Sequence, residues 1–379
     1  MRTTAKKYSN LSFGKPVQHV LPSRKALWAL VICLPLSACG GDSPGNTASV
    51  AKVSKASEAY SKKLAIPPRL QWRGNFGYCG EVAMISAGLY YGQYVSQYDA
   101  RAIASKNTPQ YKQSSQLLPG VNDVYAARQM HLKAVEWNTA TETDTNDFLA
   151  WVKQNVLASY PVLITLYTNH YLFDGSRDPN AGDPEYDHIV PVVGITSRHP
   201  LTLPATYSGD DVITFSDNGL WPVTGKPAYF YSYSFDEFQK NRAQANAPTG
   251  SVYSLSSSGT NYGIAITGVI DQDNETVPVR LTVNHNYEKP DIKPGSSLRP
   301  APMPLTLTVE VSGLKPNVAY RLYRYNRMES VPDSAFNAHA SQADKQWDIN
   351  IGSGSSYIVT EQIQSNDVAV YRAVAVDAR

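Results

Sequence analysis

Cysteine is scarce in this chain of 379 residues, which has only three, at positions 33, 39 and 79. So few cysteines exclude a disulfide-dense scaffold, and no paired spacing typical of structural zinc is present. Charge is low as well, with 17% Asp, Glu, Lys and Arg and a formal net charge of +2, so nothing favours nucleic acid as a partner. The chain also lacks a phosphate loop, a dinucleotide fingerprint and an HExxH motif. We therefore expect no cofactor and no metal.

Long apolar runs are missing too, apart from a short one near the N-terminus. A basic segment ending in Arg24 and Lys25 precedes Ala26–Leu36, an apolar core of about 11 residues. That length is too short to span a bilayer and suits the central part of a signal peptide. The next residues, Leu-Ser-Ala-Cys-Gly at 36–40, resemble a bacterial lipobox, whose cysteine is diacylated and becomes the first mature residue. An ordinary signal peptide is the alternative.

The lipobox resemblance implies three expectations. Residues 1–38 are a lipoprotein signal peptide, and Cys39 carries acyl chains of the palmitate type that anchor the protein to a membrane. Gly40, rather than Asp, follows the cysteine, which suggests the outer membrane of the bacterial cell envelope over the inner one. The small, polar residues 39–66 then form a flexible tether.

The remaining cysteine, Cys79, lies within QWRGNFGYCGEVAMISAGLYYG, residues 71–92. Apolar residues recur at helical spacing from Val82 onward, so we predict a helix that begins near Cys79 and buries one face. Gly77 and Gly80 flank the turn before it, where the backbone passes close to other groups. A thiol at a helix N-terminus meets unpaired N–H groups and the positive end of the helix dipole, which favours a thiolate. A lone, exported thiol of this kind is a candidate nucleophile.

Partners for a nucleophile come from the strands predicted downstream. Residues 160–167 and 187–195 are apolar runs of strand length, and His188 opens the second of them. Another strand, 211–216, ends in Asp217 and Asn218. A base at one strand end and an orienting acid or amide at another are what a cysteine nucleophile requires.

These pieces resemble the papain-like cysteine peptidases, most closely the bacteriocin-processing (double-glycine-leader) peptidase-like family. The matching segments are GYCGE at 77–81, DHIVPVVGI at 187–195 and FSDNG at 215–219. The resemblance implies that Cys79 is the nucleophile, that His188 is the general base, and that Asp217 or Asn218 orients the imidazole. It also implies that Gln71 donates to the oxyanion together with the backbone N–H of Cys79.

Gln71 departs from the family pattern, in which the glutamine lies six residues before the cysteine. Arg73 holds that place here, and Gln71 lies two residues further upstream. Either the turn is two residues longer, or another group such as Asn75 is the donor. His170, which follows the strand at 160–167, is a rival to His188 as the base.

Composition changes near residue 271. Segments with alternating apolar and polar residues, separated by turn residues, predict an antiparallel β-sandwich over 271–379. Val311–Pro316 followed by Tyr320 resembles a fibronectin type III corner. Alternating Tyr and Arg at 320–325 could form an outer face that binds cell-surface carbohydrate or protein, although an ordinary solvated face fits the pattern too.

The expected fold class is therefore α+β, with a papain-like domain over 67–270 and a β-sandwich over 271–379. The expected function is a lipid-anchored cysteine hydrolase that acts on peptide or amide bonds of a peptide or protein substrate through an acyl-cysteine intermediate. Two alternatives stay open. One is a transglutaminase-like acyltransferase on the same fold, and the other is a surface lipoprotein that binds a partner without catalysis.

Overall fold

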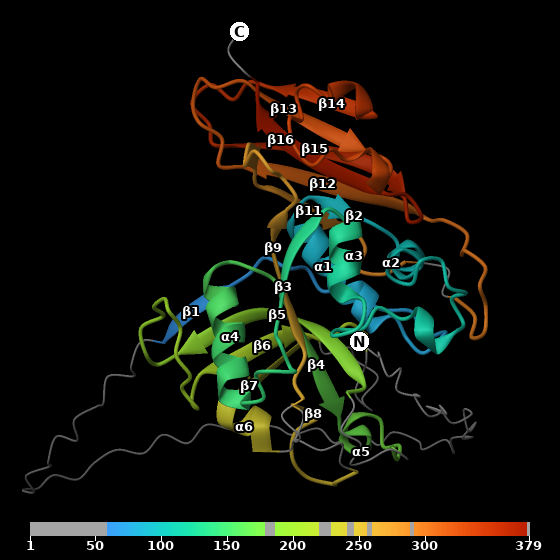
Figure 1. Ribbon diagram of the computed structural model, residues 1–379, viewed down its shortest axis with the longest axis vertical. Coiled ribbons are helices and arrows are strands. Elements are labelled where there is room, and N and C mark those ends of the chain that lie inside the picture. The colour runs from blue at the N-terminus through green and yellow to red at the C-terminus, as the bar shows by residue number, and fades with distance from the viewer. Residues whose placement is uncertain are drawn as a thin grey trace, which may run out of the picture. The chain divides into compact units, whose positions relative to one another are not determined.

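The computed structural model describes residues 59–178, 186–219, 229–240, 246–255, 260–288 and 292–376. These residues form a mixed α+β fold with six α-helices and a larger content of strand, all paired antiparallel (Figure 1). The expected signal peptide, the lipidation site Cys39 and most of the expected tether lie outside the described residues. Within the described ranges, no helix has the length and apolar character needed to cross a membrane.

The first sheet contains the strands expected before residue 270. Its order is β3 (Leu132–Glu136), β9 (Gly263–Val269), β4 (Val162–Thr168), β5 (His188–Ser197), β6 (Val212–Ser216) and β7 (Phe230–Ser234). A short strand, β8 (Tyr253–Ser254), pairs with the end of β4. The predictions of strands at 160–167, 187–195 and 211–216 are confirmed. The two central strands, β4 and β5, are buried almost throughout, as their continuous apolar runs indicate.

The C-terminal end of the expected tether is ordered. Strand β1 (Tyr60–Lys63) pairs with the second half of β5, and Leu64 and Ile66 are buried in the core beside it. For residues 60–66 the prediction of a flexible tether is therefore wrong. The segment has few large apolar side chains, but backbone pairing with β5 orders it, and such pairing leaves little trace in composition.

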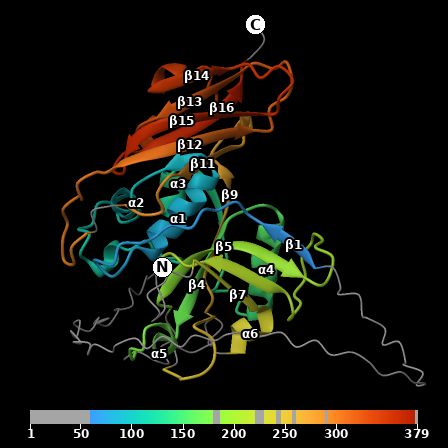
Figure 2. The same cartoon turned by 180° about the vertical axis from the view of Figure 1, so that it is seen from behind.

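The helices are α1 (Cys79–Tyr90), α2 (Gln97–Ala104), α3 (Asp123–Gln129), α4 (Thr145–Leu157), α5 (His170–Phe173) and α6 (Phe235–Lys240). The side chain of Asp144 caps α4 by accepting two backbone N–H groups, and Ser96 caps α2 by accepting the N–H of Asp99. Helix α1 begins at Cys79 as predicted, yet all its residues after Cys79 are buried. The prediction of a single buried face is wrong because α1 packs against β5 on one side and β11 on another (Figure 2).

The C-terminal residues form two further antiparallel sheets. One has the order β10 (Thr276–Val277), β16 (Ala369–Ala375), β13 (Tyr320–Tyr325) and β14 (Lys345–Ile349). The other has the order β11 (Val279–Val283), β12 (Pro304–Ser312) and β15 (Ser356–Gln364). Alternate residues of β12 are buried and join the core residues of β13 and β16, so the two sheets share one core.

These sheets are continuous with the rest of the structure. Strand β2 (Gln93–Tyr94), which follows α1, pairs with β16, and apolar residues of α1 belong to the same core cluster as those of β12. The chain from Glu58 onward forms one compact unit by its internal contacts.

The Tyr and Arg side chains at 320–325 do not form an exposed face. Tyr323 and Tyr325 are fully buried, and Arg324 pairs with buried Glu361 at 3.0 Å. Only Arg321 reaches an exposed partner, Asp348. The prediction of a Tyr/Arg outer binding surface is therefore wrong, because both faces of β13 are covered: Arg324 faces Glu361 of β15, and the Tyr323 hydroxyl donates to Asn337 at 3.0 Å.

Candidate active site

Cys79 is the first residue of α1 and follows a turn with an unusual backbone conformation. Asn75, Phe76 and Gly77 all have positive φ angles, of 53°, 69° and 80°. Gly80 follows in the first helical turn, where a Cβ would lie 2.0 Å from the carbonyl oxygen of Leu117. The turn therefore needs residues that tolerate the left-handed region, and the helix start needs a glycine at position 80.

The Cys79 thiol is half-buried and lies against the start of β5. The backbone groups of Ile189 and Gly80 near the sulfur act to lower the pKa of the thiol. Burial nevertheless raises the pKa of the thiol to about 12, and the neighbouring Glu81 carboxylate adds to this rise. The prediction of a thiolate favoured by the helix terminus is therefore wrong for this conformation. Loss of solvent and a negative charge in the first turn outweigh these backbone groups, and the resting thiol is protonated.

His188 is the first residue of β5 and is almost completely buried. Its Nε2 lies 3.4 Å from Oδ1 of Asp217, the residue directly after β6. The ring of Tyr253 stacks on the imidazole with centroids 5.8 Å apart, and its hydroxyl donates to Oδ2 of Asp217 at 3.2 Å. The Gly219 N–H also donates to Asp217. Asp217 therefore orients the ring through Nε2, which leaves Nδ1 as the nitrogen that can accept a proton.

Asn218 was considered as a residue that orients the His188 imidazole, but its amide makes other hydrogen bonds. Its Nδ2 donates to the carbonyl oxygens of Cys79 at 3.0 Å and Ile189 at 2.8 Å. The amide therefore joins the start of α1 to the start of β5, next to both Cys79 and His188. Between the two candidates for the orienting residue, Asp217 is the one that faces the imidazole.

Gln71 lies beside the cysteine turn. Its Oε1 accepts the N–H of Tyr78 at 2.8 Å, and its backbone N–H donates to the carbonyl of Asn218 at 2.6 Å. A Cβ on Gly77 would lie 2.9 Å from the same Oε1, so the glutamine packs closely on the turn. Because the carbonyl end is engaged, the Nε2 amide is the end left to donate to a substrate.

The other residues near the turn are engaged elsewhere or exposed. Asn75 donates to Ser296 O at 2.7 Å and accepts from Gly295 N at 2.7 Å, so its amide is occupied. Arg73 is exposed. Between Gln71 and Cys79 the chain holds three consecutive residues in the left-handed region, 75–77.

A buried arginine fixes the inner side of the turn. Arg101 of α2 is fully buried and pairs with Glu81 at 2.6 Å. Its guanidinium also donates to the carbonyls of Asn75 and Gly77, and it lies over the ring of Tyr78. A planar guanidinium has enough donors for this set of acceptors, whereas a lysine does not.

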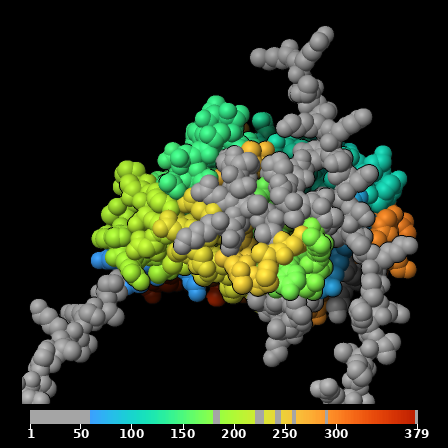
Figure 3. All heavy atoms as spheres, turned by 90° about the horizontal axis from the view of Figure 1, so that it is seen from below, coloured from blue at the N-terminus to red at the C-terminus, as the bar shows by residue number. Residues whose placement is uncertain are grey.

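His170, the rival base, lies in another cluster. Ligand atoms of His170, Asp178 and Asp187 all fall within 4.8 Å of one another and could hold a cation. Hydrogen bonds from Asn169 to Val252 and from Asp178 to Asn246 hold this segment against residues 246–254, the yellow region beside green α5 in Figure 3. Such clusters also occur without an ion, and we assign none to it.

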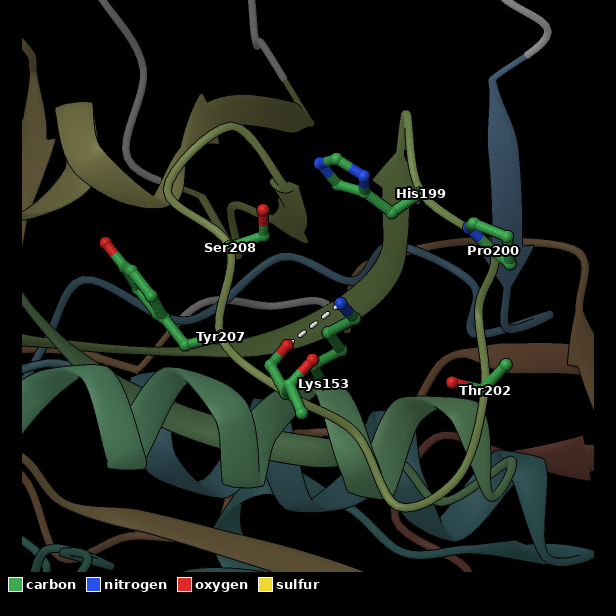
Figure 4. Close-up of a pocket in the computed structure, with 7 residues that line it drawn as sticks. Lys153, His199, Pro200, Thr202, Tyr207 and Ser208 are labelled. Carbon is green, nitrogen blue, oxygen red and sulfur yellow. Dashed lines mark hydrogen bonds between the residues drawn. The ribbon is translucent and has the colours of Figure 1, made fainter.

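A cavity of about 140 Å³ lies away from these residues, between α4 and the loop 199–208. The Lys153 ammonium donates to Thr206 O, the dashed line in Figure 4, and also to Asp211 at 2.6 Å. Because a carboxylate already neutralises this lysine, the cavity is not prepared for an anion.

Comparison with known proteins adds no relative: no family model, no curated protein and no solved structure matches this chain. The site therefore rests on its own geometry. Tyr253, Arg101 and the backbone of Ile189 were not foreseen from the sequence. The two side chains reach the site through contacts distant in the chain, and no local pattern marks them.

Proposed function

We propose that this protein is a cysteine hydrolase of papain-like fold that acts on peptide or amide bonds through an acyl-cysteine intermediate. The observation that carries the proposal is that the start of β5 and the end of β6 lie at the start of α1. Asn218, which follows β6, donates to the carbonyl oxygens of Cys79 and Ile189, and His188 faces Asp217. A helix packed on an antiparallel sheet, with the nucleophile at the helix N-terminus, is the arrangement that the sequence resemblance implies.

The high pKa of Cys79 determines how the first step would proceed. The resting enzyme holds a thiol, so Nδ1 of His188 takes the proton while sulfur attacks the substrate carbonyl. The new C–S bond places negative charge on the carbonyl oxygen. The N–H of Cys79 and the Nε2 amide of Gln71 stabilise that oxyanion. The imidazolium that forms is stabilised by Asp217.

Collapse of the tetrahedral intermediate breaks the C–N bond, and the proton on Nδ1 passes to the leaving amine. A thioester on Cys79 remains. Water, deprotonated by His188, then attacks the thioester and releases the carboxylic acid with the free thiol. An amine in place of water would give acyl transfer, so the two activities share every group named here.

The proposal includes the location of the protein in the cell. The lipobox at 36–40 supports an anchor on Cys39 in the bacterial cell envelope, with the outer membrane favoured by Gly40. The substrates would then be extracytoplasmic peptides or proteins. We also propose that the C-terminal sheets are similar to a fibronectin type III domain. One observation supports this: the N–H of Lys315 donates to the Tyr320 hydroxyl at 3.0 Å, and a tyrosine bonded to the backbone a few residues upstream is the tyrosine corner of such domains.

Acyl-enzyme formation tests the proposal directly. We expect 4-nitrophenyl esters of N-acyl amino acids to give a burst of nitrophenol with an amplitude equal to the enzyme concentration, and a thioester mapped to Cys79. Addition of an amine such as glycinamide separates hydrolysis from acyl transfer by the product formed. A wild-type protein that forms no adduct with any of a broad set of acyl esters and peptides would favour the non-catalytic binding alternative.

A further inference from the structure

The connection between β11 and β12 runs along the segment that leads into Cys79. We call the described part of this connection, residues 284–288 and 292–303, the strap. The N–H of Leu70 donates to Asn286 O at 2.6 Å, and the Trp72 indole donates to Glu288 O at 2.8 Å. Figures 1 and 2 show the orange connection leaving β12 and passing beside α2.

The strap also packs closely against the turn that precedes Cys79. Asn75 pairs with the backbone of Gly295 and Ser296 through both ends of its amide, each at 2.7 Å. One residue earlier, a Cβ on Gly74 would lie 2.6 Å from Ile292 O, so backbone meets backbone there. The contact is therefore close and uses specific hydrogen bonds.

The turn is held from both sides. Arg101 binds the carbonyls of Asn75 and Gly77 from within, and the strap binds the Asn75 side chain from the other side. Three successive positive φ angles are costly for residues other than glycine and persist only where the surroundings fix them. The N–H of Cys79 and the Gln71 amide owe their direction to this turn.

We propose that the strap is a positioning element for the nucleophile, and that Asn75 is the positioning residue through which it acts. This inference rests on the proposed function. The C-terminal sheets would then contribute to the position of Cys79, because the strap connects two of their strands, β11 and β12.

The test is Asn75→Gly in the full chain. Glycine tolerates the positive φ, so the change removes the two strap bonds, together with a longer 3.4 Å contact to the Tyr78 hydroxyl, without adding backbone strain. Asn317→Gly is the matched control, because Asn317 also has a positive φ of 60° and is exposed in the loop between β12 and β13. Asn75→Asp keeps the acceptor for Gly295 N but sets a carboxylate oxygen against Ser296 O, so it should loosen the contact at least as much as glycine does.

Two measurements are made on each variant. We expect Asn75→Gly to speed amide hydrogen exchange of residues 70–79 at least 10-fold, while exchange in β12 and β16 stays unchanged. We expect kcat for acyl transfer to fall about 10- to 100-fold with a much smaller change in KM, because a displacement near 1 Å costs about 100-fold in rate. Asn317→Gly should alter neither quantity.

The outcomes separate the strap from the proposed function. If the wild-type protein has no turnover, hydrogen exchange still decides whether the strap orders the turn. Unchanged exchange in Asn75→Gly overturns the positioning proposal. Faster exchange with wild-type kcat also overturns it, because the turn would then be held by the strap without consequence for the chemistry.

Discussion

The pKa of Cys79 gives the sharpest prediction, namely the rate at which a simple alkylating reagent modifies the folded protein. A pKa of about 12 leaves a thiolate fraction of about 3 × 10⁻⁵ at pH 7.5. An unperturbed cysteine, with a pKa near 8.5, has about a tenth of its thiol ionised at that pH. The populations alone therefore slow alkylation by about 3,000-fold.

Intrinsic nucleophilicity offsets part of this difference. A thiolate becomes more reactive as its pKa rises, with a Brønsted coefficient of about 0.4–0.5, which gives back about 40-fold over this interval. The net expectation is alkylation of folded Cys79 about 80-fold slower than that of an unperturbed thiol. The rate should also rise tenfold per pH unit up to at least pH 10.

The assay is iodoacetamide modification at pH 6.5–10, quantified by mass spectrometry on the peptide that contains Cys79. The same protein unfolded in urea supplies the unperturbed reference, and peptide mapping separates Cys79 from the other cysteines. A rate that reaches a plateau below pH 8 would show a preformed thiolate. It would refute the reasoning that desolvation and Glu81 dominate the environment of the sulfur.

Three further predictions concern residues around the site. Tyr253→Phe removes the hydroxyl bond to Asp217, so the free energy of unfolding should fall by about 1 kcal/mol and kcat should fall about 3- to 10-fold. Arg101→Ala leaves Glu81 charged and buried without its partner, so urea unfolding should show a loss of about 3–5 kcal/mol. Burial raises the pKa of Glu288 to about 7, so the folded state holds a proton that the unfolded state releases near pH 4.5. The free energy of unfolding should therefore fall by about 3 kcal/mol as pH rises from 4.5 to 7.

Each of these predictions has a control. An unchanged kcat in Tyr253→Phe would mean that the hydroxyl acts on the fold alone. The double change of Arg101→Met with Glu81→Leu should regain much of the stability lost by Arg101→Ala, because no buried charge remains. Glu288→Gln should remove its share of the pH dependence, and an unaltered profile would contradict the assignment to Glu288.

The sequence predicts best what local pattern encodes. The start of α1 at Cys79, the strands at His188 and before Asp217, and the alternating strands β12 and β16 follow from apolar periodicity and turn residues. Strand β1 does not, because its order comes from pairing with β5, which is distant in the chain.

The sequence indicated which residues lie near Cys79 better than it indicated the pKa of the thiol or the contacts around it. Helix-terminus arguments favour a thiolate at Cys79, but the outcome depends on burial and on Glu81, which packing determines. The run of left-handed residues after Gly74 also has no signature in apolar periodicity. Contacts of the strap and of Arg101 are long-range, so spacing alone carried no signal for them.

The most direct test of the central claim is covalent labelling by a substrate-like electrophile, such as a set of peptidyl vinyl sulfones, because addition to it requires both the nucleophile and the base. We predict one adduct, on Cys79, in the wild-type protein and in His170→Ala, and a loss of at least 100-fold in labelling rate in His188→Ala. Equal labelling rates in His188→Ala and wild type, or an adduct at another residue, would contradict the assignment of Cys79 and His188 as nucleophile and base.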